Sequence, residues 1–85
     1  METRIIEKDQ IKSVYVLNTW NKETLEEAYQ YLDNGYYVHF GSSCIGHTMA
    51  EIVEHDGIDL AKSKYGDRAE VVRRDGWGTL YVHLK

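Results

Sequence analysis

The strongest constraint on the fold lies near the C-terminus, where Asp75-Gly76 separates two strand-like runs within residues 69–85. An Asp-Gly pair between such runs is the strongest short-range signal for a β-hairpin, because a type I′ turn needs positive φ at both central residues. A two-residue loop would place Arg74 opposite Trp77 and Val71 opposite Leu80. The pattern therefore predicts a C-terminal hairpin.

Side chains alternate across such a hairpin, so its register assigns each residue to one of two faces. The apolar members share one face, which we expect to enter the core: Ala69, Val71, Leu80, Val82 and Leu84. The far face mixes aromatic, charged and polar side chains: Glu70, Val72, Arg74, Trp77, Thr79, Tyr81 and His83. This mixture is typical of surfaces that bind partners.

The rest of the chain alternates between strand and helix signals. Residues 4–7 and 12–18 read as strands joined by a turn at 8–10, the first of them at a sheet edge. Asn21 is suited to cap a helix over residues 22–33, and Gly35 to end it. Residues 36–40 then read as an internal strand.

A second helical pattern runs from residue 47 to 65 and contains Gly57. Because glycine weakens a helix, we expect two short helices that meet there. Met49, Ile52 and Val53 would form the core stripe of the first helix.

Together these elements predict one α+β domain over residues 1–85, in the order β-β-α-β-α-α-β-β. We expect a mainly antiparallel sheet with its helices on one face.

Size and cysteine content limit the kind of protein. A chain of 85 residues has room for one core but little for a deep pocket beside it, which argues against an enzyme. No apolar run approaches the roughly 20 residues needed to cross a bilayer, so we expect no membrane partner. Cys44 is the only cysteine and cannot form an internal disulfide, which favours the reducing cytoplasm.

The net charge of −4 is divided unevenly along the chain. Residues 1–57 carry four basic and ten acidic side chains, whereas residues 58–85 carry six basic and four acidic ones. A non-specific nucleic-acid binder would be strongly basic, so nucleic acid is the less favoured partner.

One stretch resembles an anion-binding loop. Gly41-Ser-Ser-Cys-Ile-Gly-His-Thr48 lies between a predicted strand and a predicted helix, where backbone N–H groups can surround an anion. A phosphate-binding P-loop needs lysine where this chain has His47, so an ordinary connecting loop is the favoured interpretation. Cys44 and His47 also lack a third residue that would orient them for catalysis.

His47, Glu51 and His55 recur every four residues, yet the two histidines are too far apart to share one metal ion. We interpret them as a solvated helix face. The sequence thus predicts no catalytic residue, no cofactor and no metal site.

Seven tyrosines and two tryptophans exceed what a core of this size should require. Tyr, Trp and Arg anchor many protein interfaces, because they bury a large area with few rotatable bonds. We therefore predict a partner-binding face on the hairpin, made of Val72, Arg73, Arg74, Trp77, Thr79 and Tyr81.

Two functions follow from these features. The favoured one is a non-enzymatic protein-binding module, such as a small inhibitor of the phage or mobile-element type that blocks a surface of a larger target protein. An exposed hairpin edge would also allow a homodimer.

The alternative is a winged-helix DNA-binding domain in transcriptional regulation, because the element order over residues 22–85 resembles that family. In that case Asp59, Lys62, Ser63 and Lys64 would lie on the recognition helix and the hairpin would be the wing.

Overall fold

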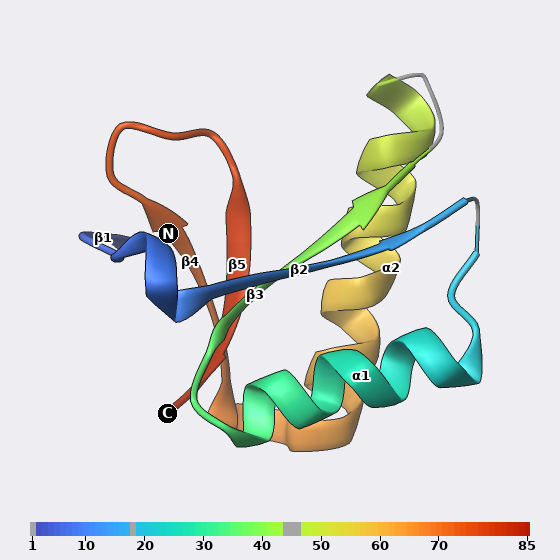
Figure 1. Ribbon diagram of the computed structural model, residues 1–85, viewed down its shortest axis with the longest axis horizontal. Coiled ribbons are helices and arrows are strands. Elements are labelled where there is room, and N and C mark those ends of the chain that lie inside the picture. The colour runs from blue at the N-terminus through green and yellow to red at the C-terminus, as the bar shows by residue number, and fades with distance from the viewer. Residues whose placement is uncertain (1, 18, 44–46) are drawn as a thin grey trace.

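The structure is a computed structural model that describes residues 2–17, 19–43 and 47–85. Five strands are described: β1 (Glu2–Arg4), β2 (Ile11–Val16), β3 (Tyr37–Ser42), β4 (Ala69–Arg74) and β5 (Leu80–Leu84). The helices are α1 (Lys22–Asp33), α2 (His47–Tyr65) and two short 3₁₀ helices, η1 (Lys8–Gln10) and η2 (Gly66–Arg68). The α+β class is confirmed (Figure 1).

The strands form a single mixed sheet in the order β1-β4-β5-β3-β2, so the prediction of a mainly antiparallel sheet is wrong. The β4–β5 and β3–β5 pairs are antiparallel, whereas β1–β4 and β2–β3 are parallel. The N-terminal strands are therefore not a hairpin but lie at opposite edges of the sheet (Figure 1). The first strand is an edge strand as predicted, but it covers Glu2–Arg4 and not residues 4–7. The predicted internal position of β3 is confirmed. The hairpin edge that was expected to be free is occupied, because β1 pairs with β4 and β3 with β5.

Helix α1 follows the sequence prediction closely. The Asn21 side chain accepts a hydrogen bond from the Thr24 backbone N–H at 2.9 Å, which satisfies one of the first-turn donors. Gly35 adopts a φ of +86° just beyond the helix end, a conformation that residues with a Cβ rarely adopt.

Helix α2 is continuous through Gly57, so the predicted break is wrong. A Cβ atom at this position would lie 2.6 Å from the Phe40 ring, which shows that glycine here allows α2 to approach β3 closely. Because the helix does not turn at residue 57, the described residues lack the helix-turn-helix on which the winged-helix alternative rests.

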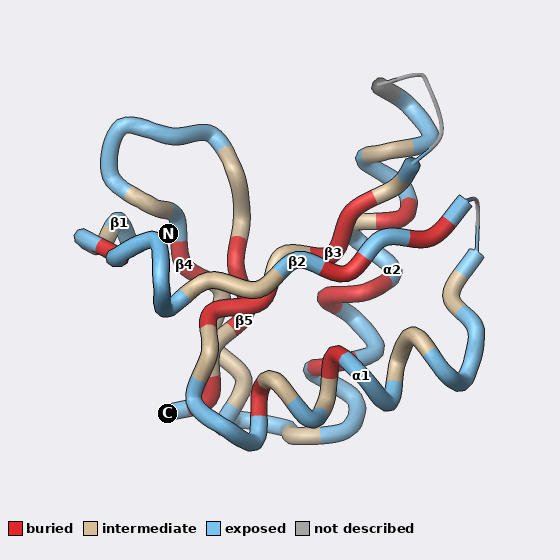
Figure 2. Tube along the Cα trace, viewed as in Figure 1, coloured by how far each residue is buried: buried red, intermediate tan, exposed pale blue. Residues whose placement is uncertain are grey.

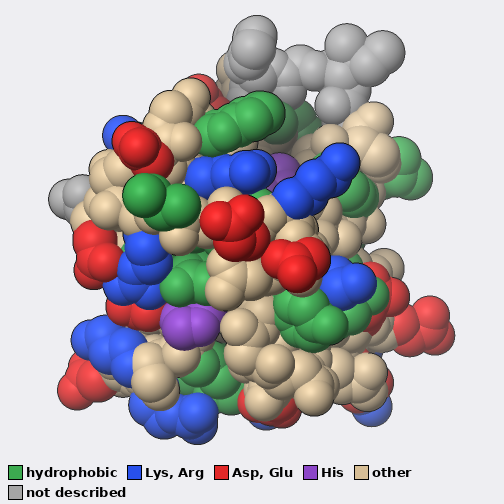
Figure 3. All heavy atoms as spheres, turned by 60° about the vertical axis from the view of Figure 1, so that its left-hand side comes forward, with side chains coloured by type: hydrophobic (Ala, Val, Ile, Leu, Met, Phe, Trp, Pro, Cys, Tyr) green, Lys and Arg blue, Asp and Glu red, His purple; other side chains and the backbone are tan. Residues whose placement is uncertain are grey.

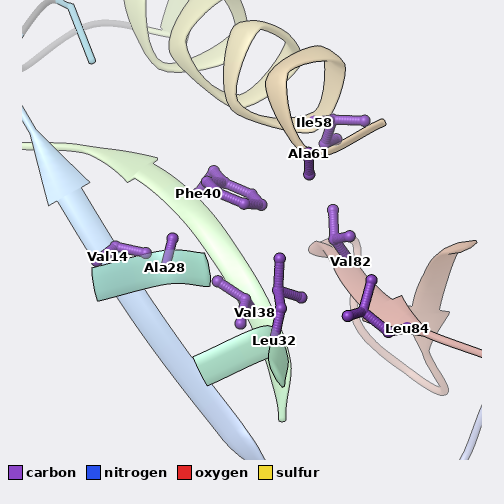
Figure 4. Packing of buried hydrophobic residues seen from close by; sticks show 9 residues of the cluster. All are labelled: Val14, Ala28, Leu32, Val38, Phe40, Ile58, Ala61, Val82 and Leu84. Carbon is purple, nitrogen blue, oxygen red and sulfur yellow. The ribbon is translucent and has the colours of Figure 1, made fainter. Parts of the chain in front are cut away.

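The main core lies between the two helices and one face of the sheet. Ala28 and Leu32 from α1 and Ile58 and Ala61 from α2 meet strand residues such as Phe40, as Figure 4 shows. Every residue of the predicted core face of the hairpin belongs to this cluster or packs against it, so that prediction is confirmed. Figure 2 shows the buried positions gathered along β3, β5 and the sheet-facing sides of both helices.

The first half of α2 buries less of its apolar stripe than predicted. Val53 is buried, but Met49 and Ile52 are exposed, Ile52 to 48%. Trp20 contacts this part of the helix at Val53, where its indole Nε1 donates to the backbone carbonyl at 2.9 Å. Two large apolar side chains of α2 therefore have no place in the core.

The C-terminal hairpin is present, but its predicted loop and register are wrong. Val71 pairs with Val82 and Arg73 with Leu80, so residues 75–79 form the loop. Only Gly76 has positive φ there, which excludes a type I′ turn, although the Trp77 N–H still donates to the Arg74 carbonyl. The register differs from the prediction by two residues, and a shift of two leaves each side chain on its predicted face.

Candidate functional site

The far face of the hairpin, where we predicted partner binding, is largely an interior surface. Val72 is 1% exposed and Tyr81 6%, and both pack in a second core cluster with Ile6 and Tyr37. The segment that follows β1 supplies Ile6, which crosses over this face of the sheet. Both faces of the central strands are thus covered by the chain itself.

A network of charged and aromatic side chains lies at the edge of this second core cluster. The Arg4 guanidinium donates to both carboxylate oxygens of Glu70, at 2.9 and 3.2 Å, and to the Tyr37 hydroxyl at 2.9 Å. Glu70 also lies 2.8 Å from Nδ1 of His83, whose ring stacks on Tyr37 with centroids 4.1 Å apart. The hydrogen bonds from Arg4 and then His83 lower the pKa of Glu70 from 4.5 to about 2.

This network satisfies groups that the sequence alone left available for a partner. Glu70 and His83 belong to the predicted far face, yet each has its charge or ring satisfied within the chain. In Figure 3, where the side of the molecule that carries β1 comes forward, hydrophobic side chains form small groups among charged ones. No continuous aromatic sheet face is offered on this side of the described residues.

The predicted partner-binding residues therefore fall into two groups. Val72 and Tyr81 lie inside and Thr79 is half-buried, so a partner could touch them only after a rearrangement. Trp77 remains 57% exposed at the hairpin loop, and the Arg74 guanidinium lies 5.1 Å from the centre of its ring. Arg73 is exposed as well.

The N-terminal strand adds a residue that the sequence interpretation missed. Arg4 pairs with Arg74, and the Asp75 N–H donates to the Arg4 carbonyl at 2.9 Å. Ile5 follows directly and is 80% exposed, so it lies at the same corner of the molecule as the hairpin loop. We call Ile5, Arg73, Arg74 and Trp77 the tip surface. No local pattern could have joined Ile5 to this group, because the β1–β4 pairing connects the two ends of the chain.

A second candidate is a cavity of about 230 Å³ between β3 and α2. In it, Nε2 of His39 lies 3.5 Å from a carboxylate oxygen of Glu54. Burial lowers the pKa of His39 and raises the pKa of Glu54, so the surroundings favour the neutral form of both groups. The pair could exchange a proton, but the serine hydroxyl of the cavity lining, that of Ser42, already donates to the Leu17 carbonyl at 2.8 Å.

The structure does not describe several side chains of the anion-loop and Cys–His motifs near the start of α2. Cys44, Gly46 and the side chain of His47 lie outside the described residues, as do the anion-loop and Cys–His interpretations that depend on them. Among the described side chains, no group of three or more His, Cys, Asp and Glu is arranged to hold a metal ion. No helix in the described part of the chain is long and apolar enough to span a membrane.

Comparison with known proteins gives no relative. No protein-family model matches the chain, and no curated protein or solved structure is significantly similar to it. Its function has to be inferred from its own surfaces and charges.

Proposed function

We propose that this protein is a non-enzymatic binding module that docks its tip surface onto a larger protein and blocks a surface there. The observation that carries the proposal is the exposure of Ile5 and Trp77, at 80% and 57%, at one corner of the fold. Large apolar side chains left in water at one corner of a small domain are typical of a protein interface.

The composition of the tip surface suits an interface anchor. Tryptophan and arginine dominate the energetically important residues of protein interfaces, and here Arg74 is already held against the Trp77 ring. This stacking reduces the side-chain freedom that binding would otherwise remove. Burying the exposed parts of both apolar side chains would contribute about 2 kcal/mol or more.

The charges indicate the chemistry of the target. Arg4 is engaged by Glu70, but Arg73 has no ion pair among the described residues and is exposed. We infer a target with an apolar pocket for Trp77 and acidic groups at its rim. A lone cysteine favours the reducing cytoplasm as the place of this encounter, and the net charge of −4 makes nucleic acid the less suitable partner.

Site-specific photo-crosslinking tests the proposal. A benzophenone amino acid is introduced at Trp77, at Ile5 or, as the control, at the exposed residue Gln30 on α1, and each protein is irradiated in the cells that produce it. We expect the same larger protein to be captured from positions 77 and 5 but not from 30. Capture from Gln30 alone, or from all three positions equally, would contradict the tip surface as the binding site.

The purified target then allows a quantitative check. Trp77→Ala should weaken binding at least tenfold, or ~1.4 kcal/mol, because a central aromatic anchor is lost. The variant should keep its thermal stability, since the Trp77 side chain is mostly exposed. Unchanged affinity would overturn the assignment.

A further inference from the structure

An apolar and acidic stripe on α2 is left uncovered by the fold. Its members lie at i, i+3, i+7, i+10 and i+11 along the helix: Met49, Ile52, Asp56, Asp59 and Leu60. This spacing places them on one face of the helix over a length of about 16 Å. Met49, Ile52 and Leu60 are three of the large hydrophobic residues that stay exposed in the structure.

One half of the stripe borders a groove. A cavity of about 350 Å³ is lined by Thr19, Trp20, Asp56, Asp59 and Leu60, between the segment before α1 and the second half of α2. The Trp20 ring is held in place from two sides, by the hydrogen bond to the Val53 carbonyl and by an edge contact with Phe40 at 5.2 Å between centroids. The apolar wall of the groove is therefore already in position.

The acidic groups in this groove have no partner within the described chain. Neither Asp56 nor Asp59 forms a salt bridge or a side-chain hydrogen bond with another described residue, and both are exposed. By contrast, Glu70 is neutralised by Arg4. Two unpaired carboxylates interleaved with apolar side chains complement a ligand that carries basic and apolar groups on one face.

We propose that this groove binds a basic amphipathic helix of a partner protein, laid along α2. A helix of about three turns matches the length of the stripe, with an apolar residue seated between Trp20 and Leu60 and lysine or arginine side chains at Asp56 and Asp59. This surface lies on the helix side of the sheet and does not include the tip surface. The protein thus offers an acidic groove in addition to its basic tip.

A synthetic 15-residue helix serves as the probe, with leucine at i, i+3, i+4 and i+7 spacing and lysine on the flanking positions, and the same peptide with glutamate in place of lysine is its comparator. Calorimetry measures each affinity for the wild type and for Asp56→Asn/Asp59→Asn. The control, Asp9→Asn/Glu27→Gln, removes the same charge from exposed positions outside the groove. We expect the lysine peptide to bind the wild type and the control alike, and the groove variant about tenfold more weakly.

The NMR signals of the two indole N–H groups locate the binding. The lysine peptide should shift the Trp20 signal and leave that of Trp77 unchanged, and Ile52→Ser, a change at an exposed position, should weaken the effect. Equal binding of the glutamate peptide, equal weakening in the control variant, or a shift at Trp77 alone would overturn the proposal. So would self-association of the wild type that Asp56→Asn/Asp59→Asn abolishes, because the groove would then hold a second copy of the chain.

Discussion

Glu70 shows how a single residue takes its role from a distant neighbour. In the sequence it is one charged member of an alternating strand, and its nearest basic neighbours are Arg68, Arg73 and Arg74 rather than Arg4. In the fold, Arg4 approaches across 66 positions of sequence and forms a two-pronged hydrogen bond with its carboxylate. The sequence predicted the face on which Glu70 lies but not this bond, because the bond depends on a parallel pairing between the two ends of the chain.

The network makes stability depend on pH. Glu70→Gln should lower the free energy of unfolding by about 2 kcal/mol at pH 7, since it removes charge-assisted hydrogen bonds whose strength is reduced by the partial exposure of Arg4. The pKa of the carboxyl falls from 4.5 to about 2 on folding, so its contribution is complete above 4.5 and is lost as the pH falls toward 2.

Urea unfolding at pH 7, 4 and 2 measures this difference. The gap between wild type and Glu70→Gln should shrink steadily and nearly vanish at pH 2. Glu26→Gln, at an exposed position on α1, should behave as the wild type throughout. A gap that stays constant with pH would show that the carboxylate charge does not stabilise the fold.

Ile5 and Ile6 are chemically identical neighbours with opposite surroundings. Ile6 is 2% exposed in the second core cluster, so Ile6→Ala should cost about 3 kcal/mol of stability. Ile5→Ala should change stability by less than ~0.5 kcal/mol, because Ile5 is 80% exposed and contributes little buried surface. Thermal unfolding of the two variants tests the pair, and equal losses would contradict the cover that Ile6 forms over Val72 and Tyr81.

Among the elements, α2 separates what periodicity can predict from what it cannot. Its apolar spacing correctly indicated a helical segment over residues 47–65, but the same spacing could not show which apolar residues would meet the sheet. We predicted a helix break at Gly57 because glycine destabilises helices. In the structure, Gly57 instead lets α2 pack closely against Phe40. The exposed stripe of Met49 and Ile52 follows from this contact, since the helix is turned to bring Gly57 and Val53 to the sheet.

Gly57→Ala distinguishes the two interpretations. Alanine within a helix normally stabilises it by about 1 kcal/mol over glycine, but here the new Cβ would overlap the Phe40 ring. We expect a net loss of about 2 kcal/mol in the free energy of unfolding, measured with urea. Gly78→Ala is the matched control, because no atom beyond its chain neighbours lies within 4 Å of the added Cβ, and it should be near neutral. A stabilised Gly57→Ala protein would show that α2 can move away from β3.

At the level of the whole molecule, one sheet is shared by two cores. Consecutive residues of β4 point to opposite faces, so Val71 packs in the helix-side cluster and Val72 in the cluster under Ile6. Alternation along each strand was readable in the sequence, as the confirmed core face of the hairpin shows. The parallel pairing of β1 with β4 was not, because short edge strands carry no signal for a partner at the far end of the chain.

Because β4 and β5 supply both clusters, the two should unfold together. The methyl groups of Val71 and Val72 report on them separately in NMR spectra recorded at increasing urea concentration. We expect one midpoint for both residues, since loss of either cluster exposes apolar side chains on strands that the other cluster also requires. In the Ile6→Ala variant both midpoints should fall by the same amount. If Val72 instead lost its native signal at lower urea than Val71, the β1 segment would be a separately unfolding cover, and the far face of the hairpin would become open to a partner.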